Sequence, residues 1–127
     1  MIKSGIYMKR DMDLIRKILL VAESDVHGFA TEKAIEIDGY TQEEIGYHVY
    51  LLGEAGLAKV IDMTFDQSAS PSARVLNLTW EGHEFLDSSR ENHIWNQAKD
   101  AIGKLGGASI QIWTSLLIAY AKKELHL

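Results

Sequence analysis

The chain of 127 residues contains no cysteine and a single proline. The absence of cysteine excludes disulfides, thiolate zinc sites and cysteine nucleophiles. The sequence also has no apolar run as long as the roughly 20 residues that a helix needs to cross a bilayer. Its longest apolar stretch, residues 110–121, is broken by Gln111, Thr114 and Ser115. The N-terminus has no apolar core of the kind that signal peptides need. We therefore expect a soluble, cytoplasmic protein that makes no membrane contact.

Basic residues are scarce in one part of the chain. The net charge is −5, from 13 Lys and Arg against 18 Asp and Glu. Residues 25–56 hold one basic residue, Lys33, against seven acidic ones, a balance of −6. Because neutralised phosphates supply most non-specific affinity for nucleic acid, this stretch is unfavourable for a polyanionic ligand. Composition is otherwise ordinary, with 46% apolar and 24% charged residues. A chain of this length and composition forms one globular domain with its own core.

Residues 39–57, GYTQEEIGYHVYLLGEAGL, carry the clearest local signals. Thr41 followed by Glu44 is a capping box, which marks a helix start. Gly56 is the typical left-handed residue at a helix end. The segment therefore predicts a helix over residues 41–55, with its buried line at Ile45, Val49 and Leu52 and with His48 and Leu51 on its flanks.

Two strands joined by a polar turn are predicted next. Residues 57–65 and 73–80 alternate apolar and polar side chains around the turn DQSASPS. Such a pattern is typical of a hairpin. The apolar residues of these strands are Val60, Met63, Phe65, Val75, Leu76 and Leu78. A helix followed by a hairpin is the order of the recognition helix and wing in a winged helix-turn-helix.

The rest of the chain predicts four more helices and one short strand. Apolar residues at helical spacing indicate a first helix over residues 11–24, and the alternation in residues 34–38 indicates a strand. A helix capped by Thr79 is expected over residues 80–90 with Phe85 and Leu86 inward. A helix from about residue 92 carries Ile94, Trp95, Ala98, Ile102 and Leu105 and stops at Gly106 and Gly107. Core or interface packing is expected for Trp80, Trp95 and Trp113.

The last helix, expected over residues 109–123, is apolar on two sides. Ile110, Trp113, Leu117 and Tyr120 form one line, and Ile112, Leu116 and Ala119 form another. A helix apolar nearly all round is usually covered on two sides. We therefore expect a homodimer that forms through the C-terminal helices, which begin at about residue 92.

The run HVYLLGEAGLAKV resembles the end of the recognition helix in winged-helix regulators, with His48, Leu52, Ala55, Gly56 and Leu57 at the matching positions. From Met8 onward, the blocks MKRDMDLIRKILL, GYTQEEIGYHVYLLGEAGL, LTWEGHEFLD and IWNQAKDAI resemble, in this order, a family of short bacterial and prophage proteins that is a domain of unknown function. The resemblance implies a winged-helix-like fold and no known activity. It also implies that residues 1–7 are an N-terminal extension of a domain spanning residues 8–127.

One departure from the winged-helix pattern stands just before the predicted recognition helix. A helix-turn-helix needs a supporting helix there, but residues 34–38 read as a strand. Either the supporting helix lies at residues 29–35, or the motif is a degenerate version.

Two hypotheses of different class follow from these patterns. The fold class we expect is α+β, mostly helical: a winged helix-turn-helix-like domain with two additional C-terminal helices. The first hypothesis is a DNA-binding transcription-regulator type; the alternative is a protein–protein interaction module of prophage origin that binds no DNA. The predicted helix presents Glu43, Gly46, Tyr47, Tyr50 and Glu54 outward, and only Gln42 is of a type favoured for reading bases. The candidate contacts with double-stranded DNA or a protein partner are Gln42, Tyr47, His48, Tyr50, Lys59 and Arg74.

We expect no enzyme, cofactor or metal. His83 and Asp87 stand four apart on a predicted helix, but two such residues do not complete a metal site. The sequence has no phosphate loop, nucleophile elbow or dinucleotide fingerprint.

Overall fold

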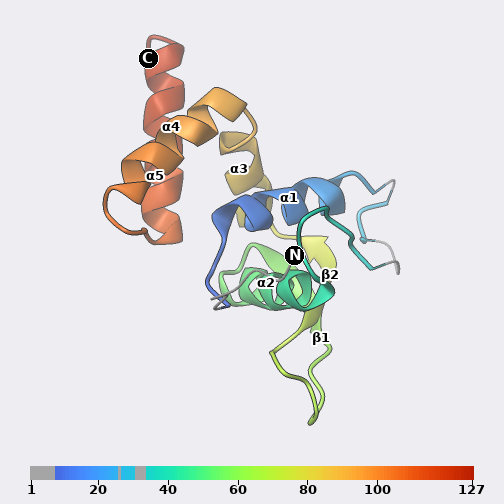
Figure 1. The fold of residues 1–127 in the computed structure, drawn as a ribbon. Helices are drawn as coiled ribbons and strands as arrows, with labels where there is room; N and C mark the ends of the chain where they lie inside the picture. The colour runs from blue at the N-terminus through green and yellow to red at the C-terminus, as the bar shows by residue number, and fades with distance from the viewer. Residues whose placement is uncertain (1–7, 26, 31–33) are drawn as a thin grey trace. The chain divides into compact units, whose positions relative to one another are not determined.

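The computed structural model describes residues 8–25, 27–30 and 34–127. The chain forms two compact units, the first ending at Thr79 and the second running from Trp80 to Leu127. Helices α1 and α2 and the strands β1 and β2 belong to the first unit, and α3, α4 and α5 to the second (Figure 1). These five helices and two strands confirm the predicted fold class, which is α+β and mostly helical with a winged-helix-like arrangement. The extension expected at residues 1–7 lies outside the described residues.

Helix α1 spans Met12–Glu23 and begins where the sequence predicts. Asp11 is its N-cap, because the Asp11 side chain accepts the Leu14 backbone N–H at 3.2 Å. Such a cap satisfies one of the donors left unpaired at a helix start. The apolar stripe of the sequence becomes its buried side: Leu14, Ile15, Ile18 and Leu19.

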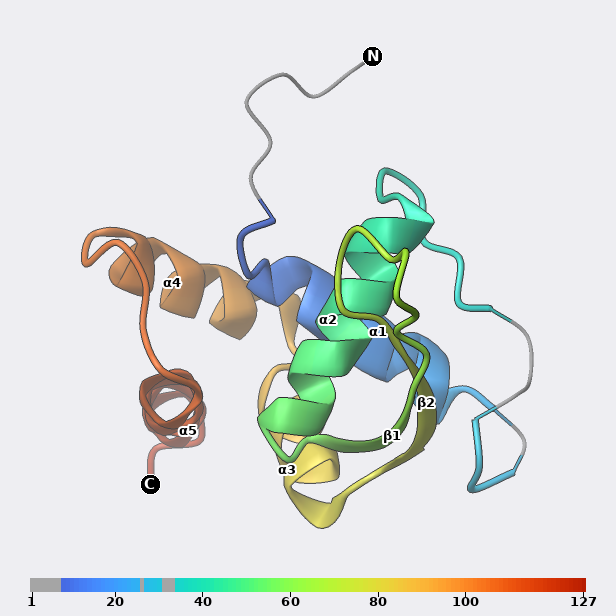
Figure 2. The same ribbon diagram turned by 90° about the horizontal axis from the view of Figure 1, so that it is seen from below.

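Helix α2 spans Gln42–Glu54 and packs against α1 and both strands (Figure 2). Thr41 accepts the Glu44 backbone N–H at 3.1 Å, while the Glu44 carboxylate accepts the Thr41 N–H at 2.9 Å. The predicted capping box is therefore confirmed. Gly56 follows the helix with φ 74°, the left-handed conformation in which glycine carries no Cβ penalty.

Strands β1 (Ala58–Asp62) and β2 (Ala73–Leu78) form an antiparallel hairpin. Its register runs from Ala58 opposite Leu78 to Asp62 opposite Ala73, with an irregularity between Lys59 and Val60. Both strands are shorter than predicted. Phe65, expected within the first strand, lies beyond β1 and is 70% exposed. One further backbone hydrogen bond, from the Met63 N–H to the Ser72 carbonyl at 2.8 Å, joins the two sides of the hairpin past Asp62.

The strand predicted over residues 34–38 is wrong. Residues 34–37 have no regular structure, and a turn follows at Asp38 and Gly39. The bond to β2 is made further upstream, where the Ala30 N–H donates to the Leu76 carbonyl at 2.9 Å. Phe29, Ala30 and residues 34–35 are not helical either. The proposed supporting helix is therefore not seen at the described positions of residues 29–35, and the helix that packs on α2 is α1.

The second unit contains α3 (Trp80–Ser88), α4 (Asn92–Gly103) and α5 (Ile110–Glu124). Aromatic rings join the three helices: Trp95 stacks on Trp113 with centroids 4.7 Å apart and meets Phe85 edge-on at 6.2 Å. Such pairs are favourable beyond their buried area. Trp80 is 76% exposed, so of the two packing roles expected for it the core is excluded. Leu105, expected on the fourth helix, lies beyond the end of α4 at Gly103 and is 74% exposed.

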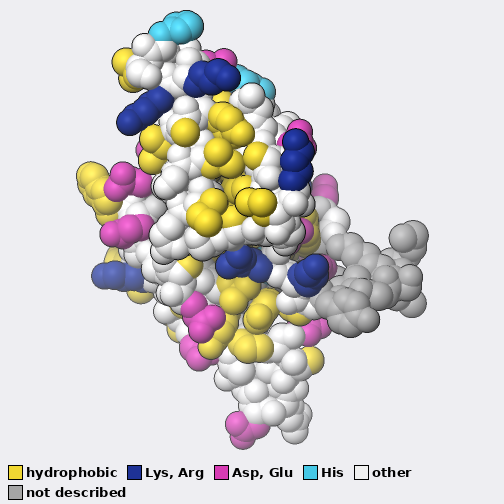
Figure 3. All heavy atoms as spheres, turned by 90° about the vertical axis from the view of Figure 1, so that its left-hand side faces the viewer, with side chains coloured by type: hydrophobic (Ala, Val, Ile, Leu, Met, Phe, Trp, Pro, Cys, Tyr) yellow, Lys and Arg dark blue, Asp and Glu magenta, His cyan; other side chains and the backbone are white. Residues whose placement is uncertain are grey.

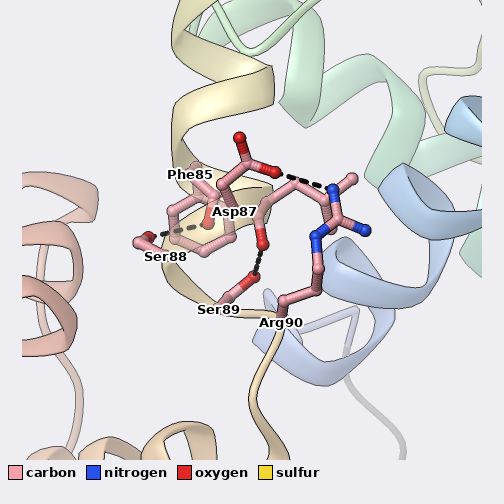
Figure 4. A network of polar contacts seen from close by, with 6 residues as sticks. Phe85, Asp87, Ser88, Ser89 and Arg90 are labelled. Atoms are coloured by element: carbon pink, nitrogen blue, oxygen red, sulfur yellow. Dashed lines mark hydrogen bonds and ion pairs between the residues drawn. The ribbon is translucent and has the colours of Figure 1, made fainter. Parts of the chain in front are cut away.

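Helix α3 ends two residues before the expected position, at Ser88 (Figure 4). The Ser88 hydroxyl donates to the Phe85 carbonyl at 2.8 Å, and the buried Ser89 hydroxyl donates to the Leu86 carbonyl at 3.0 Å. The same two carbonyls also accept the Ser89 backbone N–H, at 3.0 and 3.1 Å, so side-chain hydroxyls add a second donor to each at the helix end. Arg90 lies beyond the helix and pairs with Asp87 at 2.7 Å.

Candidate functional site

One side of α2 carries two stacked, half-buried tyrosines between two exposed carboxylates. Glu43, Tyr47, Tyr50 and Glu54 recur at intervals of three and four residues, which places them on one side of the helix. The rings of Tyr47 and Tyr50 stack with centroids 6.5 Å apart and planes 12° from parallel. Glu43 and Glu54 are exposed. We call these four residues the tyrosine face; α2 contributes no lysine or arginine to it.

The sequence predicts Gly46 on this outward side, but in the structure Gly46 lies against the hairpin instead. A Cβ added at Gly46 would lie 2.4 Å from Ser72 Oγ, and one added at Gly53 would lie 2.6 Å from Val60 Cγ2. Both distances are too short for real contacts, so the two glycines lie directly against the hairpin. Glycine gives no hydrophobic signal, and for this reason the sequence did not reveal the second contact side of α2.

The tip of the hairpin is bonded back to the start of α2. The Ser70 hydroxyl donates to Glu43 Oε2 at 2.6 Å. Within the tip, Thr64 Oγ1 accepts the Ser72 N–H at 2.9 Å, and Ser68 Oγ accepts the Phe65 N–H at 2.9 Å. The sequence indicated a polar turn but not this link between Ser70 and Glu43, because the two residues lie 27 positions apart.

His48 is removed from the contact surface by its burial. Its side chain is 1% exposed, and both ring nitrogens have partners. Nε2 accepts the Asp11 backbone N–H at 2.9 Å, so Nδ1 carries the proton that goes to the Glu44 carbonyl at 2.8 Å. His48 therefore joins the start of α1 to α2 and is unable to contact DNA or another protein.

Tyr40 completes this polar link. Its hydroxyl donates to Asp11 Oδ2 at 3.1 Å, and the Lys17 ammonium lies 5.5 Å from its ring centroid. Burial and the Asp11 carboxylate raise the pKa of Tyr40 to about 12. Because the same Asp11 also caps α1, Tyr40 and His48 both fix the start of that helix.

The other candidate contacts are not gathered on the tyrosine face. Gln42 donates through Nε2 to the Ile35 carbonyl at 2.9 Å. In the hairpin, Val60 contacts α2 at Gly53, so the neighbouring Lys59 points to the opposite side of β1. Arg74 stands opposite Ile61 in the ladder and is among the residues that line the cavity beside α2. Lys59 and Arg74 therefore lie in the hairpin and do not belong to the tyrosine face.

A cavity of about 460 Å³ lies between α2, the hairpin and the segment that connects α1 to α2. Its walls include Val21, Ile35, Val49, Met63 and Val75, and Glu43 also lines it. The volume falls within the range of small-molecule sites. Apolar side chains make up much of these walls, and Asp25, Glu43 and Arg74 add charged groups to the lining.

The second unit exposes an apolar groove of about 500 Å³ along α4 and α5. Its residues include Leu105, two residues beyond the end of α4, and Ile112, Leu116 and Ala119 from α5. Figure 3 shows hydrophobic side chains gathered over these helices with Lys and Arg around them. Within the second unit, the second apolar line expected on α5 therefore lines an open groove.

Among the described residues, no three His, Asp or Glu side chains converge as a metal site would need. Asp87, the proposed neighbour of His83, pairs with Arg90. In the same parts of the chain, no helix has the length and apolar character to cross a membrane.

Comparison with known proteins places the chain in a family without an assigned activity. It is 41% identical over 95 residues to an uncharacterized protein of Haemophilus influenzae, covering 75% of this chain and 79% of that protein. No solved structure matches it. Residues 9–109 match the family described as hypothetical protein (DUF2513). This match covers α1 to α4 and ends before the first residue of α5. The chain therefore belongs to the DUF2513 family.

Proposed function

We propose that the tyrosine face of α2 binds a basic segment of a partner protein. The observation that carries the proposal is the stacked pair Tyr47–Tyr50 between the carboxylates of Glu43 and Glu54. Tyrosine is enriched at protein interfaces. A guanidinium group stacks on aromatic rings and pairs with carboxylates, so an arginine side chain matches both features of this face.

The charge of α2 favours a protein over DNA as the partner of this face. Glu43, Glu44 and Glu54 all belong to α2, which has no basic residue. Phosphates near these carboxylates would be repelled, whereas arginines would be attracted. Gln42 is the one side chain of a base-reading type, and it is bonded to Ile35.

Chemical-shift mapping with a hexa-arginine peptide as the probe tests this proposal. We expect the amide signals of Tyr47, Tyr50 and Glu54 to shift with added peptide and the shifts to weaken as salt rises. The double variant Tyr47→Ala/Tyr50→Ala removes the stacked pair and should lose the response. Lys59→Ala/Arg74→Ala is the matched control, and it should respond like the wild type. A wild-type protein whose α2 signals do not move would refute the proposal.

A second candidate function is binding of double-stranded DNA. It is favoured by the helix–hairpin order and by the basic residues Lys59 and Arg74 of the two strands, which would contact phosphates. Anisotropy titration with a mixed-sequence duplex at low salt tests it. Lys59→Ala/Arg74→Ala should weaken binding and lower its salt dependence. No binding at roughly tens of micromolar protein would rule this candidate out.

We also propose that two chains associate through the groove of α4 and α5. The support is that Ile112 is 50% and Leu105 is 74% exposed beside Leu116 and Ala119. Exposed apolar patches of this kind commonly mark interfaces. Light scattering should give the mass of a dimer for the wild type and of a monomer for Ile112→Glu. A wild-type monomer at high concentration would contradict the association.

A further inference from the structure

The imidazole of His93 is held between carboxylates from two helices. His93 belongs to the first turn of α4, and Glu91 is the N-cap residue of that helix. His93 Nδ1 lies 3.1 Å from Glu91 Oε1, and His93 Nε2 bonds to Glu124 Oε2 at the last residue of α5. Both ring nitrogens therefore face carboxylate oxygens.

This geometry requires the charged form of the ring. A carboxylate only accepts hydrogen bonds, and neutral imidazole donates from one nitrogen alone. Both contacts exist together when both nitrogens carry a proton. The two carboxylates raise the pKa of His93 through hydrogen bonds, first from Glu124 and then from Glu91. Loss of the proton must break at least one of the two contacts.

The position of the contact gives this proton a structural role. Helices α4 and α5 pack together and are connected by residues 104–109, which include Gly106 and Gly107 in left-handed conformations. The His93–Glu124 bond ties the start of α4 to the end of α5, so it closes the end of the helix pair that has no chain connection. We propose that His93 is a pH-sensitive latch, which holds the last turn of α5 on α4 when protonated and releases it when neutral.

The other charged side chains of the last turn of α5 and the end of α3 do not take over the contact that His93 makes with Glu124. Lys122 and Lys123 belong to the same last turn of α5 and have no carboxylate contact among the described side chains. From α3, which also packs on α5, Asp87 pairs with Arg90. The latch contributes stability that is complete below the unfolded pKa of histidine, roughly 6.5, and that is lost as pH rises through the raised folded pKa.

Hydrogen exchange of the α5 amides tests the latch. After correction for intrinsic exchange, opening of the residues 121–125 should increase about two- to fivefold between about pH 5.5 and about pH 8.5, the range expected for an exposed ion pair. In Glu124→Gln and His93→Gln this pH dependence should be absent. The matched control is His83→Gln, because His83 is an exposed histidine on α3 and its loss should leave the pH dependence intact.

The titration of the His93 ring by NMR gives an independent reading. We expect a midpoint above that of a free histidine in the wild type and a lower midpoint in Glu124→Gln. A wild-type ring that titrates at or below the free value, or α5 exchange that does not change with pH, would overturn the proposal. Either result would leave the partner proposal for α2 untouched, since the two sites belong to different units.

Discussion

The buried ring of His48 accepts the backbone N–H of Asp11 at 2.9 Å and so joins residues 37 positions apart in the sequence. Asp11 in turn caps α1 and accepts the Tyr40 hydroxyl. The start of α1 is therefore fixed by two side chains that come from α2 and from the segment before it. The hydrogen bond between His48 and Asp11 therefore fixes the start of α1 against α2.

Replacement of His48 by phenylalanine tests this link. His48→Phe keeps a ring of similar size but removes the acceptor for Asp11 and the donor to the Glu44 carbonyl. We expect the free energy of unfolding to fall by about 1–3 kcal/mol, the cost of leaving buried polar groups unpaired. Urea denaturation measures it. His83→Phe, on an exposed position of α3, should change it by less than about 0.5 kcal/mol; equal effects of the two variants would contradict the assignment.

The capping box of α2 should have a measurable effect of its own. Thr41→Ala removes the hydroxyl that accepts the Glu44 N–H, and we expect a loss of about 1 kcal/mol in the free energy of unfolding. Thr41→Ser retains a hydroxyl and serves as the control, with little loss. If serine destabilises the protein as much as alanine, the hydrogen bond is not the source of the effect.

Two glycines in helices should respond in opposite ways to alanine. At Gly53 the new methyl would meet Val60 Cγ2 at 2.6 Å, and a β-branched valine has little freedom to move aside. Gly53→Ala should therefore destabilise the protein by about 1–3 kcal/mol. Gly103, at the end of α4, has no atom within 4 Å of the added Cβ, so Gly103→Ala should be neutral or stabilising by up to about 1 kcal/mol. Thermal unfolding of the two variants distinguishes these outcomes, and a Gly53→Ala variant as stable as wild type would be inconsistent with the close contact.

Tyr40 should ionise later than an ordinary tyrosine. Burial and Asp11 raise its pKa to about 12, whereas a free tyrosine ionises near about 10. The neutral form is thus favoured by folding, and this stabilising contribution is lost as pH rises from about 10 through about 12. Absorbance titration of the wild type against Tyr40→Phe isolates this group among the five tyrosines. A difference curve centred near the free value would show that the contact with Asp11 is not formed.

The elements predicted from the sequence with success are those with local signals. Thr41, Glu44 and Gly56 mark both ends of α2 within one short stretch, and Ser109 caps α5 at the expected place. Helix signals depend on neighbours in the sequence, so they do not require knowledge of the tertiary structure. The overall class followed from these elements and their order.

The predictions that failed depended on distant residues. The alternation in residues 34–38 satisfies a strand pattern, but a strand needs a partner, and the bond to β2 is made by Ala30 instead. His48 occupies a flank of α2 by spacing, yet its bond to Asp11 at the start of α1 buries it. Gly46 gave no sign of the hairpin that lies against it. Of the candidate site, the structure brings Tyr47 into contact with Tyr50 and, edge-on, with the buried ring of His48.

The central claim is that α2 presents the tyrosine face to a basic protein segment. A titration of labelled hexa-arginine peptide into wild type, Tyr47→Ala/Tyr50→Ala and Lys59→Ala/Arg74→Ala, followed by fluorescence anisotropy at low salt, tests it most directly. We expect the tyrosine variant to bind at least about tenfold more weakly, which corresponds to about 1.4 kcal/mol, and the Lys59/Arg74 variant to bind as well as wild type. Equal affinity of all three proteins for the peptide would contradict the claim.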